Sequence, residues 1–278
     1  MAIKLYPTPR DFLRDNSAFL DRYEVQSQLN RGNAAAHRDE PSAPALLFGR
    51  VELDGAPVLL FGNTLPWNLC LNSADPDPSK AVSELASYLR DKNIEITGVT
   101  ARDALCQAFM AAYGGKFTLR ETLDIMVLST LIEPPPCPGT VQKAALSDLD
   151  LIVDWKCATL REALHEEPVP ERVRETTLDQ LKRSVVWLMR DPSGEPVSMA
   201  NSGRMLERGA CVSGVYTPPE HRGKGYCQNT VAALCRELLA CGKSYVTLFV
   251  DKKNPISNRV YRKIGFEILE DSSDYRLV

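Results

Sequence analysis

The chain has 278 residues, of which 44% are hydrophobic and 25% are charged. Its 33 basic and 36 acidic side chains leave a formal net charge of −3, so we expect no broad basic face for nucleic acid or anionic lipid. No apolar run approaches the roughly 20 residues that a membrane-spanning helix needs, and the N-terminus lacks the apolar stretch of a signal peptide. The composition predicts a cytoplasmic protein with one large domain or two smaller ones.

The unusual feature of the composition is its eight cysteines, which mostly lie in apolar runs and form no CxxC pair. The histidines, His37, His165 and His221, are scattered along the chain. The ligand spacing of a zinc site is therefore missing, and we expect no metal. In a long chain without an export signal, free buried thiols are favoured over a disulfide framework.

The residues before position 133 predict mixed α and β structure without a phosphate-binding glycine loop. A turn at Asp54-Gly55 joins two strands, and Gly114-Gly115 ends the second of two amphipathic helices. The expected elements are helices 10–23 and 24–37, strands 45–53 and 57–61, helices 79–91 and 100–113, and strand 117–131.

Proline punctuates the chain most strongly at 133–139, where four prolines in five positions follow Glu133. Prolines cannot continue a β-ladder or a helix, and they favour an extended spacer. We therefore expect an N-terminal domain over 1–132, a linker over 133–139 and a C-terminal domain over 140–278. Alternatively, these prolines form a loop inside one large fold.

The residues after the prolines predict a more regular alternation of strands and helices. Ser147 and Asp150 have the spacing of a helix N-cap with an acid at its third position. The expected elements are strand 141–145, a helix from Ser147, helix 171–184, strands 185–190, 196–203 and 209–216, helix 223–240, strand 245–250, helix 257–264, and strands 266–269 and 274–278.

The most informative segment is 214–228, where a strand ends, two prolines follow and Arg-Gly-Lys-Gly-Tyr-Cys leads into an apolar helix. Such a turn brings backbone N–H groups together, and the helix dipole adds about half a positive charge. Gly223 and Gly225 let the backbone approach a ligand, while Arg222 and Lys224 add charge. A phosphate or pyrophosphate is the expected ligand.

By itself this glycine pattern is weak evidence for any one ligand. It lacks the longer span and downstream acid of a dinucleotide fingerprint, and the Gly-Lys-Ser/Thr of a nucleotide P-loop. A nucleotide-binding protein is therefore disfavoured. A surface turn that enters a helix would explain the same residues.

A second segment adds specificity, because the chain reads Asn-Pro-Ile-Ser-Asn-Arg-Val-Tyr-Arg-Lys-Ile-Gly-Phe at 254–266. Together the two segments resemble the signature of the GCN5-related N-acetyltransferases (GNAT). The first is similar to that family's Arg/Gln-x-x-Gly-x-Gly/Ala acyl-CoA loop, with Cys227 in place of the final Gly or Ala. The second motif is matched by Asn254, Ser257, Tyr261 and Gly265-Phe266. The resemblance covers about residues 140–278.

The whole chain also resembles a narrower two-domain acetyltransferase group, and glycine N-acyltransferase-like proteins share its plan. The likeness is carried by Val-Tyr-Thr-Pro-Pro-Glu at 215–220, by the start of the second motif and by Pro-Val-Ser-Met-Ala at 196–200. It implies an α/β (α+β) architecture of tandem GNAT-like folds, each a mixed twisted β-sheet flanked by helices. It further implies that 1–132 is a degenerate copy and that 140–278 binds acyl-CoA.

The resemblance implies attack of a primary amine on the thioester of acetyl-CoA or another acyl-CoA. The pantetheine arm would pair with strand 212–217, a bulge would separate this strand from 245–250, and a backbone N–H near Val215 would polarise the thioester carbonyl. The implied cofactor-binding residues are Val215, Tyr216, Thr217, Arg222, Gly223, Lys224, Gly225, Tyr226, Cys227, Asn254 and Asn258.

Two catalytic residues are expected from the resemblance. Tyr261 matches the family's tyrosine that protonates the departing thiolate, and a phenol with a pKa of about 10 is protonated at neutral pH; from spacing alone, packing under the C-terminal strands is an equal reading. Asp251 is the best-placed candidate for the general base, although it can equally cap the turn before Asn254. A water relay is an alternative base, and His221, Glu207 and Glu220 are weaker candidates.

Two functions are therefore carried forward from the sequence. The first is an N-acyltransferase acting on a small amine or a peptide, as a monomer or homodimer without nucleic acid or membrane. The alternative is a non-catalytic acyl-CoA-binding or sensing protein. The tyrosine at position 261 favours the first, because a sensor has no need for an acid there.

Overall fold

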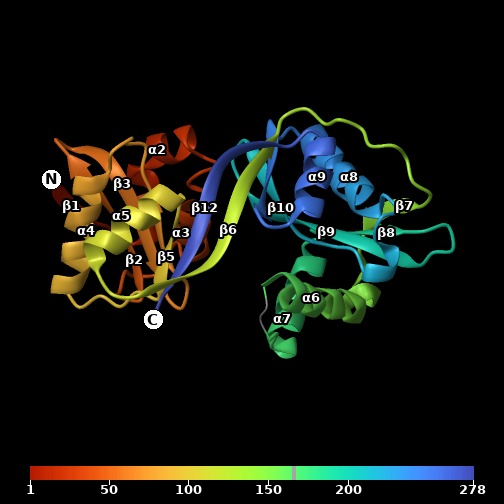
Figure 1. Cartoon of the computed structure of the whole chain (residues 1–278), viewed down its shortest axis with the longest axis horizontal. Helices are drawn as coiled ribbons and strands as arrows, with labels where there is room; N and C mark the ends of the chain where they lie inside the picture. Colours follow the sequence, from red (N-terminus) through yellow and green to blue (C-terminus); the bar gives the residue numbers. More distant parts are fainter. Residues whose placement is uncertain (165–166) are drawn as a thin grey trace. The chain divides into compact units, whose positions relative to one another are not determined.

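The computed structural model describes residues 1–164 and 167–278 (Figure 1); His165 therefore lies outside the described residues. The chain forms two compact units that each draw on several segments. Unit 1 consists of Met1–Ile125, Val250–Lys253 and Ile268–Val278. Unit 2 consists of Met126–Phe249 and Asn254–Glu267.

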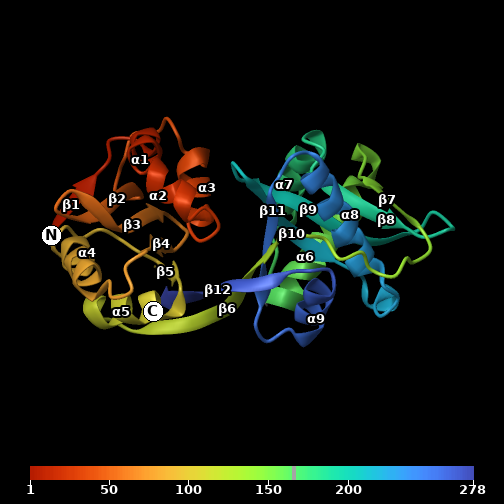
Figure 2. The same ribbon diagram turned by 90° about the horizontal axis from the view of Figure 1, so that it is seen from above.

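Unit 1 is built on strands in the order β1-β2-β3-β4-β5-β12, antiparallel except for the parallel pair β4–β5. Figure 2 shows α1, α2 and α3 on one side of these strands and α4 and α5 on the other. The elements are β1 (Ala2–Leu5), α1 (Pro9–Asp15), α2 (Ser17–Arg22), α3 (Gln28–Ala36), β2 (Leu46–Leu53), β3 (Ala56–Thr64), β4 (Leu69–Asn72), α4 (Ser79–Asp91), β5 (Gly98–Ala101), α5 (Asp103–Tyr113) and β6 (Phe117–Leu128).

Unit 2 orders its strands β11-β10-β9-β8-β7, antiparallel except for the parallel pair β10–β11. In Figure 1, α6 and α7 lie on one side of these strands, and α8 and α9 on the other. The elements are β7 (Thr140–Lys143), α6 (Leu149–Leu164), α7 (Pro170–Lys182), β8 (Val186–Arg190), β9 (Pro196–Met205), β10 (Gly209–Tyr216), α8 (Tyr226–Ala240), β11 (Tyr245–Asp251) and α9 (Pro255–Lys263), with short 3-10 turns at Leu146–Asp148 and Pro219–His221. The chain then ends with β12 (Glu267–Leu277), which belongs to unit 1 from Ile268 onward.

The two halves of the chain repeat one plan. Each begins with a strand and helices, continues with three strands, and ends with helix, strand, helix and strand. In each half the only parallel pair described flanks the first helix of that ending: β4–β5 flanks α4, and β10–β11 flanks α8. The expected tandem arrangement of mixed α/β folds is confirmed.

The last strand of each half reaches into the other unit. Residues Ser273–Arg276 of β12 pair antiparallel with β5 in unit 1. The end of β6 belongs to unit 2, where Thr247 Oγ1 donates a hydrogen bond to Met126 O at 2.9 Å. The compact units therefore do not coincide with the stretches before and after the prolines. The division into domains at 133–139 stays a prediction.

Several elements differ from the sequence expectations. The short strands β1, β4 and β5 were not expected, and β5 takes the place of the first turn expected for helix 100–113. The expected helix 10–23 is interrupted at Asn16, and the helix expected over 24–37 begins only at Gln28. Four-residue strands carry too little periodicity to be recognised, because their pairing partners decide whether they form.

The end of the chain is one long strand, not two. Ser272 and Ser273 suggest a turn by composition, but they are 5% and 2% exposed and lie inside β12. Ser273 pairs with Ala101 of β5, so the strand continues through the serines.

Apolar clusters of buried residues form the cores of the described units. One packs α4 and α5 against the unit 1 strands, around Leu85, Leu89 and Phe109. A second, on α1 to α3 and β2–β3, contains Phe12 and Phe48. In unit 2 a cluster joins α6 and α7 to β8, β9 and β10 through Ile152, Leu181, Val186, Leu188, Met199 and Tyr216. This last cluster places α6 and α7 on the strand end that carries the candidate site.

The cysteines are less uniformly buried than expected. Cys70, Cys106, Cys157, Cys211 and Cys235 are buried, as predicted. Cys241 is exposed just beyond α8, and Cys137 and Cys227 are only half-buried. The expectation of a buried thiol is therefore wrong for Cys241, because the apolar stretch before it ends with the helix. None of the helices within the described residues is long and apolar enough to cross a membrane.

Candidate active site

The site begins where β10 and β11 stop pairing. The parallel register joins Gly209–Val212 to residues 245–248, and in the described chain it ends at Val212 and Leu248, although β10 continues to Tyr216. On the other edge of β10, the pairing with β9 shifts between Ser213 and Tyr216, which marks a bulge. The bulge expected on strand 212–217 is present, and the described pairing of β10 with β11 ends before it.

Glycine is required at the bulge. Gly214 has φ +57°, and a Cβ built there would lie 2.7 Å from Nδ2 of Asn201 on β9. The Asn201 amide therefore occupies the space that a side chain at position 214 would need. The bulge and the asparagine form one packed unit.

The glycine loop connects β10 to α8. Gly223 has φ +77°, and Gly225, with φ +85°, is the N-cap residue of α8 in the left-handed region. No side chain caps this helix start, so first-turn N–H groups remain available for an anion. Arg222, Gly223 and Lys224 are exposed. The predicted loop is thus an open helix N-terminus with the conformation that glycine allows.

An acidic residue on α6 holds the start of this loop. Arg222 donates through a terminal guanidinium nitrogen to Glu162 Oε2 at 2.6 Å and through Nε to Thr217 O at 2.9 Å. Tyr216 donates its hydroxyl to Glu162 Oε1 at 2.8 Å. Burial and the nearby Glu162 raise the pKa of Tyr216 to about 12, while Arg222 lowers the pKa of Glu162. Helix α6 is therefore linked to the loop.

The proline segment packs against α8. Asn229 Nδ2 donates to Gly225 O at 3.0 Å and to Pro135 O at 3.1 Å. Arg236 pairs with Glu133 in a two-pronged contact of 3.0 and 2.5 Å. A segment predicted as a spacer thus lies along the helix that begins at the glycine loop.

Tyr261 lies beside the first helix turn after that loop. Its ring is 7% exposed and packs edge-on against Phe266, with centroids 5.9 Å apart. Burial, followed by the neighbouring thiols of Cys227 and Cys235, raises the pKa of Tyr261 above its usual value. Burial also raises the pKa of the Cys227 thiol to about 11. The structure thus brings Tyr261 close to the first helix turn after the glycine loop, two features that the two motifs predicted separately.

The polar residues at the start of α9 serve the helix. Asn254 is its N-cap, and Oδ1 accepts the Ser257 N–H at 3.0 Å. Asn258 donates through Nδ2 to Asn254 O at 2.9 Å. Their expected contacts with an acyl-CoA stay predictions, made from a position that also stabilises the helix.

Asp251 belongs to unit 1, whereas the other predicted site residues belong to unit 2. Its carboxylate accepts the Lys253 N–H at 2.8 Å, which is the turn-capping role weighed as its alternative. His221 lies 3.6 Å from the carboxylate of Glu195. Val215, Tyr216, Thr217, Tyr226 and Cys227 all lie on the strand end or the first helix turn around the glycine loop.

Sequence reasoning overlooked Glu162 and a polar cluster of Lys156, Gln180 and Asn201. One signal was available: Lys156 follows Ile152 by four residues, so it lies on the face by which α6 packs against the sheet. No motif marks the other members. In the described residues, no group of three or more His, Cys, Asp and Glu side chains could hold a metal ion.

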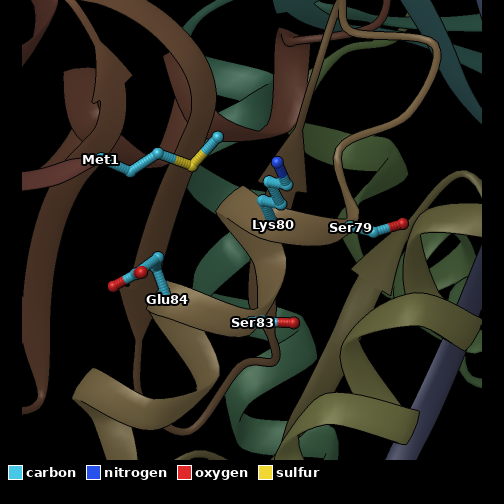
Figure 3. A pocket seen from close by; sticks show the side chains of 5 residues that line it. All are labelled: Met1, Ser79, Lys80, Ser83 and Glu84. Atoms are coloured by element: carbon cyan, nitrogen blue, oxygen red, sulfur yellow. The ribbon is translucent and has the colours of Figure 1, made fainter.

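Two hollows occur in unit 1 and contain none of the predicted site residues. One, of about 360 Å³, is lined by Met1 and by four residues of α4, Ser79, Lys80, Ser83 and Glu84 (Figure 3). The other, of about 490 Å³, is lined mainly by apolar residues such as Leu5, Leu47 and Ile94. The first lies at the N-terminal turns of α4, but the segment before α4 is Asp-Pro-Asp-Pro and has no glycine. It therefore lacks the backbone freedom of the loop before α8.

Comparison with known proteins agrees with this geometry. Residues 149–266 match the model of the acetyltransferase (GNAT) family, and no curated protein matches the chain. A GNAT-family acetyltransferase structure from Colwellia psychrerythraea is 13% identical, with 100% of both chains covered and a TM-score of 0.64. A GCN5-related N-acetyltransferase from Sphaerobacter thermophilus is 15% identical over 99% of this chain and 94% of that one, with a TM-score of 0.65. A tandem GNAT protein from the clavulanic acid biosynthesis pathway is 13% identical over 99% and 97%, with a TM-score of 0.57.

Proposed function

Because residues 149–266 match the model of the acetyltransferase (GNAT) family, we propose that this chain transfers an acetyl group from acetyl-CoA to a primary amine. One observation carries the proposal: an uncapped, glycine-bearing helix start follows a strand that bulges where its parallel neighbour stops pairing. The helix start suits a pyrophosphate, and the unpaired strand edge suits the amide-bearing pantetheine arm. The two features would therefore bind two successive parts of one donor, its pyrophosphate and its pantetheine arm.

The donor is held mainly by backbone groups in this proposal. The N–H groups from Arg222 to Cys227 bind the pyrophosphate, and the N–H near Val215 polarises the thioester carbonyl as negative charge develops on its oxygen. Arg222 adds positive charge at the rim, although Glu162 already holds its guanidinium. A loop of this kind binds an anion without a basic chain, in agreement with the net charge of −3.

Tyr261 is the proposed general acid. The amine nitrogen attacks the thioester carbon and forms a C–N bond, the C–S bond breaks, and the thiolate takes the phenolic proton of Tyr261. The proton lost from the amine passes to a base or to water, and the tyrosine is reprotonated from solvent. Asp251 stays a candidate base, with a water relay as its alternative, because an α-amine near pKa 8 needs little assistance.

The proposal is tested by thiol release from acetyl-CoA in the presence of a panel of primary amines. Release that depends on both substrates, with an acetylated amine as product, supports the transferase. Tight binding of acetyl-CoA without release for any amine would support the non-catalytic sensor instead. No binding at all would contradict both functions.

The rate should keep rising on the alkaline side of neutrality. Tyr261 stays protonated because burial raises the pKa of its phenol, whereas the acceptor amine becomes a nucleophile as it loses its proton. For an acceptor that carries no anionic group, we expect kcat/KM to rise with pH until the amine is neutral and then to level off through about pH 10. A profile with a clear alkaline fall well below pH 10, in a protein that is still folded, would contradict Tyr261 as the acid.

An alanine at position 214, in the bulge, should lower kcat. In Gly214→Ala the new Cβ meets the Asn201 amide, and the alanine must keep the positive φ of the glycine, which costs about 1–2 kcal/mol. The bulge then shifts, and we expect kcat at saturating acetyl-CoA to fall roughly tenfold. Gly194→Ala is the matched control, because Gly194 has φ +89° and a Cβ there meets nothing within 4 Å. Equal kcat in the two variants would contradict a role for the bulge.

A further inference from the structure

A polar cluster between α6, α7 and β9 joins side chains that no motif marks. Lys156 Nζ donates to Thr177 Oγ1 at 3.1 Å and also to Gln180 Oε1. Asn201 Nδ2 donates to the same Gln180 oxygen in a long contact of 3.4 Å. A single amide oxygen therefore lies between the lysine and the asparagine.

Lys156 is a half-buried cation without an anionic partner among the described residues. Both of its acceptors are neutral oxygens, and an ammonium has three N–H donors, so one remains for another group. Burial lowers the pKa of Lys156 to about 8, and no nearby carboxylate opposes that shift. Charges withdrawn from water are normally paired, so this ammonium has the environment of a cation that receives its anion from outside.

Asn201 has the opposite requirement. Its side chain is 4% exposed, and within the described structure its Oδ1 is buried without a hydrogen-bond donor. Because Lys156 already donates to Gln180 Oε1, that oxygen is an acceptor, and Asn201 must face it with Nδ2. Its Oδ1 is thereby left over, and a buried carbonyl oxygen without a donor is unfavourable until a ligand N–H supplies one.

The cluster adjoins the strand end where the thioester is proposed to lie. Asn201 is paired with Ser213, the residue at which the bulge begins, and its amide packs against Gly214. Trp155, next to Lys156 on α6, has its ring 6.0 Å from that of Tyr216 at the end of β10. Among the described residues, Lys156 lacks an anion and Asn201 Oδ1 lacks a hydrogen-bond donor, and both groups thus lie close to the bulge.

We propose that Lys156 and Asn201 form the acceptor subsite, and that the acceptor is a primary amine that carries a carboxylate, as an amino acid does. Lys156 Nζ donates to the carboxylate, and Asn201 Oδ1 accepts one N–H of the amine, whose lone pair is left for the thioester carbon. Gln180 keeps the two groups at the short separation that such a molecule has. This inference rests on the proposed acyltransferase function.

The test compares acceptors that differ only in the anion. For the full chain with acetyl-CoA, kcat/KM is measured for phenylalanine, phenylalaninamide and phenethylamine. We expect phenylalanine to be preferred about 10-fold or more, as a charge-assisted hydrogen bond provides, with the difference mainly in KM. Lys156→Met should reduce the preference to about one, and Lys156→Arg should restore part of it.

Lys182→Met is the control for Lys156→Met, since it removes an exposed lysine of α7 and changes the net charge equally. It should leave the preference unchanged. Because Lys156 lacks an ion pair in the described residues, its replacement by an apolar side chain should not lower Tm. Asn201→Ala gives an independent test: KM for the amino acid should rise, because the amine loses the oxygen that accepts its N–H.

Three results would overturn the subsite. The first is equal use of the acid and its amide by the wild type. The second is a loss in Lys156→Met that affects both acceptors equally and accompanies a lower Tm. The third is preference for phosphoethanolamine over ethanolamine without any preference for phenylalanine, which would assign a phosphate in place of the carboxylate. Absence of thiol release with every amine would instead contradict the proposed function itself.

Discussion

Tyr261→Phe should lower kcat by about 100-fold or more and leave KM for acetyl-CoA nearly unchanged. General acids contribute roughly 10²–10⁴-fold to proton-transfer steps, and phenylalanine removes only the proton donor. The phenol makes no hydrogen bond within the described residues and packs against Phe266, so Tm should not fall. Steady-state kinetics and a melting curve on the same preparation give both measurements.

The control for this variant is Tyr245→Phe, which removes a hydroxyl at the start of β11. It should retain wild-type kcat. With acetyl-CoA as the donor, the departing thiolate is the same for every acceptor. All acceptors should therefore respond to Tyr261→Phe by a similar factor, because the proton goes to this thiolate and not to the amine. A variant that keeps its kcat would return Tyr261 to the packing role that its burial alone explains.

Gly225→Ala should raise KM for acetyl-CoA by about 5- to 30-fold, while kcat at saturation changes little. A non-glycine residue in the left-handed region costs about 1–2 kcal/mol, and the methyl group lies where a pyrophosphate approaches the backbone. The built Cβ meets only ordinary contacts, with Cys137 Cβ at 3.7 Å, so the variant should fold. Binding of acetyl-CoA by calorimetry gives the affinity directly.

Gly242→Ala is the matched control for the loop variant. Gly242 has φ +89°, and a Cβ there meets nothing within 4 Å, so the backbone strain is similar but lies beyond the far end of α8. Both variants should lose similar Tm, and only Gly225→Ala should lose affinity. Equal affinity in the two would mean that the loop does not bind the donor.

Long, strongly patterned elements could be read from the sequence. The helix expected over 79–91 is α4, and the strand expected over 209–216 is β10, each with the same bounds. In α4 the buried positions Val82, Leu85 and Leu89 recur at helical spacing. Such elements can be predicted from their own residues, because the period of the apolar residues indicates which face will be buried.

The donor side of the site could also be inferred, because it depends on residues that are close in the chain. Gly223 and Gly225 lie directly before an apolar helix, and Tyr261 lies in a motif of neighbouring residues. The structure adds that Tyr261 is buried near Cys227, and that burial, followed by the thiols of Cys227 and Cys235, raises the pKa of its phenol.

The proposed acceptor side could not be inferred in the same way. Lys156, Gln180 and Asn201 come from two helices and a strand, and each has an ordinary sequence context. The pairing of Glu162 with Arg222 likewise joins residues 60 positions apart. Their roles arise from burial and from the partners they meet, neither of which local spacing encodes.

The sequence by itself determined the mixed α/β character of both halves, the glycine turn before an apolar helix, and the resemblance to the GNAT family, whose model matches residues 149–266. These follow from local periodicity and backbone freedom, which neighbouring residues set. Only the tertiary structure decided that β12 pairs with β5, that the proline segment packs on α8, and that Lys156, which has no counter-ion among the described residues, lies close to Asn201 at the bulge. Strand partners and buried charges depend on which distant surfaces exclude water together, and that is a property of the folded chain.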